Sequence, residues 1–549
     1  MDCYIDKKTG TYAETLEAVG LASAAHELGF RGVRVKDKGT HFHIHSEQDS
    51  AAHSVLSAGY PYIWLKSKEP ERPTIRFLDY EGEKEKRDAA KKVGKKAKTA
   101  LDAVEIEVPA VHPELNPATM LASMRKGWNG DRDIALWVKD HPEQAANWVV
   151  FRLGLGAQPS EKFPEVSNTQ ILNPISGKGV HAGKTEIRSS GSLPGQLVDS
   201  FSEWMKMRGL WGSALLYRSD DDFKFFVIEP ADIAVDEIEK LRSALQAENL
   251  WGGVQLDIYA TLQCTRILIL QSDAVQDRTK QDGTTSVRLR GRKPRAVIAG
   301  LRQAYFKSLG TAAALMNDAF LPLPDWFAVH TEEDANAYLS IIDEAIAKGG
   351  CLKSLQEKHS DDGHILQQYR EWLLSGELTD LLEFHYLFAL HVMQCLSRKD
   401  WVRPFGTENL SILLTRAYEE KHQVTEIIEN PGFQSVARAL RNATVYALTI
   451  PSLRREVRFG IAQKWKQKIK AGDEEFAAEL AEFVQEYNWE TAHRLKGKGH
   501  SVTTEDLDAL LLLIHERKAD LVGALLLAYG YARAPKIETA QPEEAVAEV

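Results

Sequence analysis

The spacing of apolar residues changes along the chain from a mixed pattern to a purely helical one. Residues 11–28 repeat apolar positions at helical spacing and are followed by Gly29, which predicts a helix with a glycine stop. Residues 32–45 alternate with a period of two around a turn at 37–39, which predicts a β-hairpin. The N-terminal region therefore combines helices with strands.

The middle of the chain continues this mixture. Residues 197–205 carry an apolar stripe at helical spacing, and residues 222–230 have the pattern of a strand that ends at a proline. Residues 233–248 have the pattern of a helix, and residues 254–270 fit either a strand or a buried helix.

Residues 286–310 combine a basic stretch with a change of spacing. Arg288 and Arg290 share the face of a predicted strand, and no acidic residue interrupts the whole stretch. After Pro294, helical spacing is shown by the apolar residues Val297, Leu301 and Tyr305.

Beyond residue 332 the pattern is helical, and it ends in a polar tail at residues 534–549 that we expect to be disordered. The fold class predicted is therefore α+β, with a mixed α/β N-terminal region followed by an all-α C-terminal bundle. The predicted domains are residues 1–150, 151–330 and 331–533, followed by the acidic tail.

Composition narrows the class of protein. The net charge of −10 and the hydrophobic fraction of 44% are those of an ordinary soluble protein of several domains. The four cysteines are far apart, which argues against a disulfide scaffold and fits a reducing cytoplasm. We expect no signal peptide and no membrane span, because no apolar run is long enough.

A glycine- and lysine-rich loop at residues 173–185 first suggests a nucleotide-binding P-loop. The spacing rejects this interpretation, because five residues before Gly183 stands Lys178 rather than glycine. The loop could still hold phosphates through backbone N–H groups, although a solvated surface loop is the simpler interpretation.

Two further basic segments have similar alternatives. Residues 81–98 are too polar to bury a face and fit either a solubilising linker or an arm that follows phosphates. Residues 431–470 hold nine lysines and arginines against the single acid Glu456, beside apolar stripes at helical spacing.

Three histidines, His41, His43 and His45, share one face of the predicted hairpin. A metal site would need a further ligand, and a polar strand face is the simpler interpretation. We find no sequence motif of a hydrolase, kinase, zinc protease or dinucleotide enzyme, so we expect neither catalysis nor a cofactor or bound metal.

Four stretches, in this order, resemble the large subunit of type I CRISPR Cascade surveillance complexes. They are the loop that begins Asn-Pro-Ile-Ser-Gly-Lys-Gly, residues 209–233 with Gly-Leu-Trp-Gly-Ser-Ala-Leu-Leu, residues 304–326 with Ala-Tyr-Phe-Lys-Ser-Leu-Gly, and residues 432–445 with Gly-Phe-Gln-Ser-Val-Ala-Arg. The resemblance covers roughly residues 170–460 and leaves the first 150 residues unmatched.

The resemblance implies a role without catalysis. Such a subunit contacts the crRNA and the other Cascade subunits, reads the short PAM motif in duplex DNA and helps to start strand separation. It also holds displaced DNA and offers a surface to the recruited helicase-nuclease. Because guide pairing carries the sequence information, the protein needs only backbone contacts and a short duplex reader.

We assign candidate residues on this basis. The duplex reader is expected in the loop, at Asn173, Ser176, Gly177, Lys178, Gly179 and Lys184. Contacts to the backbone or the displaced strand are expected from Lys91, Lys92, Lys95, Lys96, Arg288, Arg290, Arg292, Lys293, Arg438, Arg441, Arg454, Arg455 and Arg458.

Two alternatives remain open. A metal-dependent nucleic-acid enzyme would use the three histidines with a carboxylate such as Asp37. A helical scaffold that binds no nucleic acid would instead pair its basic faces with acidic helices.

Overall fold

The computed structural model describes residues 1–47, 56, 137, 138, 140–164, 172–174, 199–219, 222–248, 250, 252–276, 286–308 and 313–535. They form two compact units, Met1–Trp251 with Leu270–Leu323 and Gly252–Ile269 with Pro324–Val549. The first unit mixes strands and helices and the second is helical, so the α+β prediction is confirmed.

The first unit opens with a strand, a helix and a hairpin. These elements are β1 (Asp2–Asp6), α1 (Tyr12–Glu27), β2 (Arg34–Asp37) and β3 (His41–His45). Helix α1 begins at the capping box of Thr11 and Glu14, and Gly29 follows it with φ of +94°. The predicted helix and hairpin are both confirmed.

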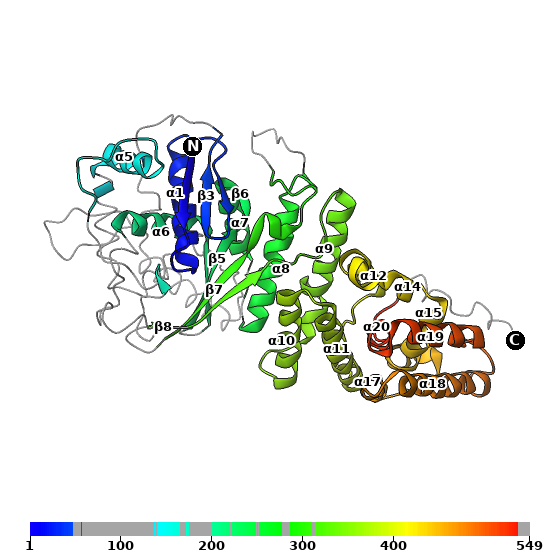
Figure 1. The fold of residues 1–549 in the computed structure, drawn as a ribbon. Coiled ribbons are helices and arrows are strands. Elements are labelled where there is room, and N and C mark those ends of the chain that lie inside the picture. The colour runs from blue at the N-terminus through cyan, green and yellow to red at the C-terminus, as the bar shows by residue number, and fades with distance from the viewer. Residues whose placement is uncertain are drawn as a thin grey trace, which may run out of the picture. The chain divides into compact units, whose positions relative to one another are not determined.

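Two antiparallel four-stranded sheets organise the first unit (Figure 1). The first has the order β1-β3-β2-β6, where β6 is Asp232–Ala234. The second has the order β4-β5-β7-β8, built from Ala214–Ser219, Asp222–Pro230, Ile298–Ser308 and Ala313–Pro322. The described part of this unit also contains the helices α5 (Pro142–Arg152), α6 (Ser200–Ser213) and α7 (Val235–Ala247).

A 3-10 turn at Pro294–Ala296 is followed by strand β7, which begins at Ile298, so the helical prediction for Val297, Leu301 and Tyr305 is wrong. A spacing of four residues fits one face of a helix, but it is also an even number and fits one face of a strand. Strand β7 pairs with β5 on one side and β8 on the other, and this long-range pairing decides the conformation.

The second unit consists of helices. It contains α8 (Val254–Leu270), α9 (Glu332–Ile346), α10 (Ser360–Ser375), α11 (Leu378–Arg398) and α12 (Thr407–Ala417). The short helices α13 (Glu419–His422) and α14 (Val424–Ile428) lead to α15 (Pro431–Ala443) and α16 (Val445–Thr449). The last four are α17 (Ile461–Ala471), α18 (Asp473–His493), α19 (Thr504–Arg517) and α20 (Ala519–Gly530).

The amphipathic pattern explains why these helices pack together. The stripe of Phe433, Val436 and Leu440 on α15 is completely buried, as the sequence predicted. Helix α17 begins only at Ile461, after an irregular segment that ends at Gly460 with φ of +80°. Within the described residues, no helix is long and apolar enough to cross a membrane.

Candidate functional site

The outer face of the first sheet gathers the polar side chains of its strands. Phe42 and Ile44 of β3 are buried, and the alternating positions His41, His43 and His45 point to the opposite face. The period of two therefore places the three histidines as the sequence predicted.

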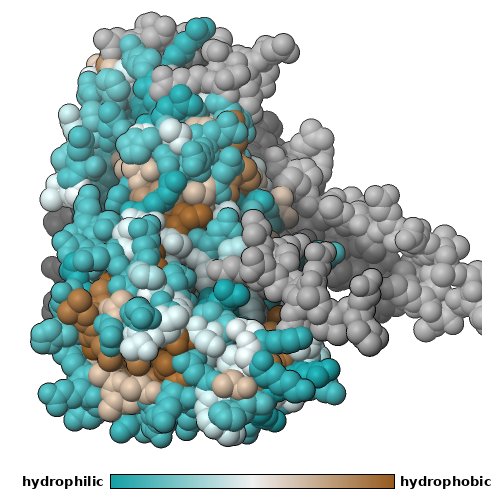
Figure 2. Space-filling view, turned by 90° about the vertical axis from the view of Figure 1, so that its right-hand side faces the viewer, coloured by the Kyte–Doolittle hydropathy of each residue, from teal (hydrophilic) through white to brown (hydrophobic). Residues whose placement is uncertain are grey.

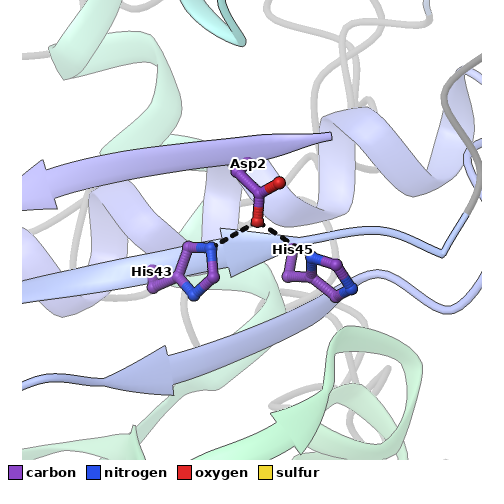
Figure 3. Close-up of side chains that lie close together, drawn as sticks. All are labelled: Asp2, His43 and His45. Atoms are coloured by element: carbon purple, nitrogen blue, oxygen red, sulfur yellow. Dashed lines mark hydrogen bonds and ion pairs between the residues drawn. The ribbon is translucent and has the colours of Figure 1, made fainter.

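Asp2 supplies the carboxylate of this face (Figure 3). It lies directly opposite His45 in the antiparallel register of β1 and β3. Its Oδ1 atom is 2.7 Å from Nε2 of His43 and 2.9 Å from Nδ1 of His45. Hydrogen bonds from His45 and His43 lower the pKa of the Asp2 carboxyl.

The structure corrects the carboxylate that the sequence suggested. Asp37 forms an ion pair with Lys7 at 2.8 Å and lies outside the cluster. The third histidine also lies outside it, because His41 Nδ1 contacts the hydroxyl of Thr40 at 3.1 Å. The cluster of Asp2, His43 and His45 was missed because strand β1 pairs with β3 only in the folded chain.

An exposed aromatic side chain extends the same face. The ring of Tyr4, which is 58% exposed, stacks on His43 with their centroids 4.8 Å apart. On the other side of β3, the register places Arg34 opposite His45 and Lys36 opposite His43. The face therefore offers an aromatic ring and cations beside the histidine–carboxylate cluster.

The basic loop, residues 286–295, lies in the same unit and is held on a buried anchor. Asp273 Oδ1 accepts hydrogen bonds from the backbone N–H groups of Leu289 at 2.9 Å and Arg290 at 2.8 Å. Leu289 is buried between the exposed Arg288 and Arg290. The predicted strand is a single bridge, between Ser272 and Val287, rather than a full strand.

The cationic side chains of the basic loop differ in their exposure and in their ion pairs. Arg295 is exposed and has no ion pair within the described part of the chain, and Lys293 is also exposed. Arg288 is 4.0 Å from Glu47, and Arg292 is 3.4 Å from Asp232. Most of the positive charge therefore faces solvent, as phosphate binding requires.

The glycine- and lysine-rich loop lies almost wholly outside the described residues, and this includes Ser176, Gly177, Lys178, Gly179 and Lys184. Lys91, Lys92, Lys95 and Lys96 lie outside them too. Asn173 is described and is buried, with its side chain bonded to Glu203 at 2.8 Å and Lys206 at 2.6 Å. Its predicted contact with DNA does not fit this interior position.

Two arginines predicted to hold the displaced strand are also buried. Arg441 is 3% exposed and donates to the backbone carbonyls of Ala532 and Tyr529. Arg455 donates to Thr491 at 2.8 Å and to the carbonyl of His500 at 3.1 Å. These side chains stabilise the helical unit, because each satisfies buried acceptors, and phosphate contact would require unpacking them.

The remaining arginines of that set are accessible. Arg454 is exposed, Arg438 is half-buried, and neither has an ion pair within the described residues. Arg458 forms an ion pair with Glu486. Arg454 follows a 3-10 turn and does not lie on a helix with Arg458.

The sequence analysis missed a second basic surface, which we call the basic tip and define as Arg454 with residues 489–498. Helix α18 ends there, and Lys496 and Lys498 in the following loop are exposed without an ion pair among the described residues. Arg455, the residue after Arg454, donates a hydrogen bond to the carbonyl of His500, which holds the end of this loop near Arg454. The run Lys-Gly-Lys-Gly was the available sequence signal.

An aromatic stack completes the basic tip. Trp489 is 58% exposed, and its ring lies over His493 with centroids 4.6 Å apart and an interplanar angle of 23°. A large exposed ring costs solvation free energy unless a partner covers it. Figure 2 shows a mostly hydrophilic face on which hydrophobic residues form separate patches.

A pocket of about 650 Å³ in the helical unit is lined by Asp362 and His391, and Cys395 contacts His391 without lining the pocket itself. His391 Nδ1 is 3.1 Å from Asp362 Oδ1, and Cys395 Sγ is 3.4 Å from His391 Nε2. Burial and the charges of Asp400 and Asp362 raise the pKa of the Cys395 thiol. The thiol is therefore protonated at neutral pH, which makes this trio a poor nucleophilic site.

Comparison with known proteins adds no assignment. No protein-family model matches the chain, and no curated protein matches it. The function must therefore be argued from the chain's own residues and from the sequence resemblance.

Proposed function

We propose that this chain binds nucleic acid as the large subunit of a type I CRISPR Cascade complex and is not itself an enzyme. The observation that carries the proposal is the basic tip, which combines the exposed stack of Trp489 and His493 with three exposed cations, Arg454, Lys496 and Lys498, that have no ion pair among the described residues. Arg494 of the same segment is paired with Glu456 and Glu490. Cations attract phosphates of any sequence, and an exposed ring offers a face to an unpaired base. This pairing of charge and aromatic surface favours single-stranded nucleic acid.

The two described basic surfaces suggest a division of tasks. The basic loop presents arginines from a rigid anchor, which suits contacts to a phosphate backbone. The basic tip suits displaced single strands. It would bind strands of many different sequences, because every base has an aromatic face that can stack on an exposed ring. We still propose that Ser176, Lys178 and Lys184 read the PAM motif in duplex DNA, and we no longer include Asn173.

The partners implied by this role are crRNA, target duplex DNA, the other Cascade subunits and a recruited helicase-nuclease. Only the contacts to nucleic acid have a structural argument, through the two basic surfaces. The assembly contacts rest on the sequence resemblance alone.

The test measures binding of a fluorescent single-stranded DNA by anisotropy at several salt concentrations. We expect Trp489→Ala to weaken binding about 5- to 150-fold, because stacking of one base contributes roughly 1–3 kcal/mol. Replacing Lys496 and Lys498 by alanine should lower the slope of log K against log salt by about 0.7 for each lost phosphate contact.

Matched variants separate a binding surface from a general loss of stability. Trp401 is 56% exposed in the same unit and gives the control Trp401→Ala. The exposed Lys348 and Lys358 give the charge control. Equal binding by Trp489→Ala and Trp401→Ala, or a salt slope unchanged by loss of Lys496 and Lys498, would refute the role of the basic tip.

A separate test addresses the duplex reader. Reversing the charge at Lys178 and Lys184 should abolish the dependence of binding on the PAM while assembly with the other subunits continues. The assay compares duplexes with and without each candidate PAM, and an unchanged preference would contradict the assignment of the loop.

The alternative, a metal-dependent nucleic-acid enzyme, is favoured by one observation, the meeting of Asp2 with His43 and His45. Its test is incubation of single- and double-stranded substrates with the purified chain and Mn²⁺. Cleavage that disappears in His43→Gln and persists in His41→Gln would support the enzyme over the binding subunit.

A further inference from the structure

We propose that Asp2, His43 and His45 bind one divalent ion of a first-row transition metal, of which Zn²⁺ is the representative. The argument rests on the geometry of strands β1 and β3 and does not depend on nucleic-acid binding. Among the described residues, this is the single group of three metal-ligating side chains whose ligand atoms all lie within 4.8 Å of one another.

The backbone register creates the site. Asp2 faces His45 across the antiparallel pair, and His43 lies two residues away on the same face of the same strand. Side chains in these direct and diagonal positions are within reach of one another. The rigid sheet therefore brings the three ligands together without any loop closing over them.

The distances between the three side chains are close to those that a metal ion would require. Asp2 Oδ1 is 2.7 Å and 2.9 Å from the two imidazole nitrogens. Ligands about 2.0–2.2 Å from a tetrahedral zinc ion are roughly 3.4 Å apart. Small rotations of three side chains would open the cluster by the roughly 0.5–0.7 Å required, because Asp2 and His45 are 54% and 37% exposed.

The donor set selects the class of metal. Imidazole nitrogens with one carboxylate suit Zn²⁺, Fe²⁺, Ni²⁺ and Cu²⁺, whereas Mg²⁺ and Ca²⁺ prefer oxygen ligands throughout. No sulfur belongs to the cluster, since Cys3 points to the buried side of β1. Three protein ligands leave at least one coordination position for water or another ligand.

The neighbours of the cluster favour this use. Tyr4 stacks on His43 and fixes the plane of its ring. The guanidinium of Arg34, opposite His45, is neutralised by Asp232 at 3.0 Å, which limits its repulsion of a bound cation.

The experiment titrates Zn²⁺ into the metal-free full chain, purified without a polyhistidine tag, against a chromophoric chelator. We expect one ion per chain and a loss of affinity of about 100-fold or more in Asp2→Asn, His43→Gln and His45→Gln. The matched control is His41→Gln, on the same face of the same strand, which should bind zinc as the parent does. Mg²⁺ and Ca²⁺ should not compete.

Two outcomes would overturn the proposal: no stoichiometric binding by the parent, or equal affinity in His43→Gln and His41→Gln. If a variant does not fold, X-ray absorption of the zinc-loaded parent decides, because two imidazoles with oxygen support the site and a sulfur ligand refutes it. No nucleic acid enters these measurements, so their result is independent of the proposed binding role.

Discussion

Glu237 is an acid buried at the start of helix α7, where it caps the helix. Its Oε2 atom accepts a hydrogen bond from the backbone N–H of Ala234 at 3.1 Å. Burial raises the pKa of this carboxyl to about 7, against the opposing effects of that hydrogen bond and of Arg34. Between pH 4.5 and about 7, the Glu237 carboxyl is therefore protonated in the folded state and ionised in the unfolded chain, where its pKa has the ordinary value of 4.5.

The consequence is a loss of stability as the pH rises through that window. Between pH 4.5 and 7 the folded state binds more protons than the unfolded state, so the free energy of unfolding falls with increasing pH. Glu237→Gln keeps an acceptor for the cap and removes the buried charge. We expect it to raise the stability of α7 at pH 8 by about 2 kcal/mol and to change little at pH 4.

Hydrogen exchange of the α7 amides measures this effect directly. Asp236→Asn, which removes an acid from the same turn at a more exposed position, is the control. Equal protection of the parent and Glu237→Gln at pH 8 would show that the Glu237 carboxylate is not destabilising.

At the same scale, the sequence predicted the histidine face but not its carboxylate. Alternation along one strand is a local property, so the common face of His43 and His45 could be read directly. Asp2 joins them through a pairing across some forty residues, which no local pattern carries. Burial of Arg441 was similarly hidden, because its acceptors lie on residues 529 and 532.

At the scale of elements, helices α1 and α6 cross at two reciprocal glycines. A Cβ atom added at Gly20 would lie 1.8 Å from the carbonyl oxygen of Met205, and one added at Gly209 would lie 1.8 Å from that of Leu16. The two backbones therefore approach more closely than any side chain allows. Both glycines sit inside helices, where they would otherwise cost about 0.5–1 kcal/mol relative to alanine.

We expect Gly209→Ala to destabilise the first unit by about 1–3 kcal/mol or more, because the added methyl group forces the two helices apart. Thermal unfolding followed by circular dichroism, with exchange of the α1 amides, measures the change. Gly212→Ala in the same helix is the control, since its Cβ would meet side-chain atoms of Val19 at 3.2 Å and Glu239 at 3.6 Å rather than a backbone. Equal melting of the two variants would contradict a backbone contact at Gly209.

The helices were the elements that the sequence predicted best. An amphipathic stripe such as that on α15 extends over three turns, so its period is distinct. Strand β7 was misread because its spacing of four residues suits both structures, and residues 254–270 stayed ambiguous because apolar side chains surround that helix. In both segments, neighbours distant in sequence determine the conformation.

At the scale of the whole molecule, the chain leaves the first unit after residue 251 and returns to it at 270, so that helix α8 packs in the helical unit. Contacts of Asp257 with Arg370 at 3.0 Å and of Arg266 with Asp343 at 2.7 Å attach it there. A local sequence pattern does not reveal that a helix belongs to a different unit from the residues on either side of it. The two units also differ in their buried titratable groups.

The helical unit contains two histidines that burial keeps neutral. The pKa of His385 is lowered to about 4 by burial, and that of His500 is lowered to about 4 by burial and by the charges of Arg438 and Arg455. As the pH falls below 6.5, the ordinary pKa of histidine, these side chains become protonated in the unfolded chain but stay neutral in the folded unit. Stability is therefore lost from pH 6.5 down to about 4.

We expect acidification from pH 7 to pH 5 to destabilise the helical unit by about 2 kcal/mol for each of these histidines. The buried Glu237 gives the first unit the opposite response over the same interval. Hydrogen exchange at both pH values should therefore show a larger loss of protection in α11 and α15 than in α7. His385→Leu suits the apolar surroundings of Phe384 and Phe405 and should remove about half of the acid sensitivity. Parallel losses in both units, unchanged by His385→Leu, would mean that other groups control the response to acid.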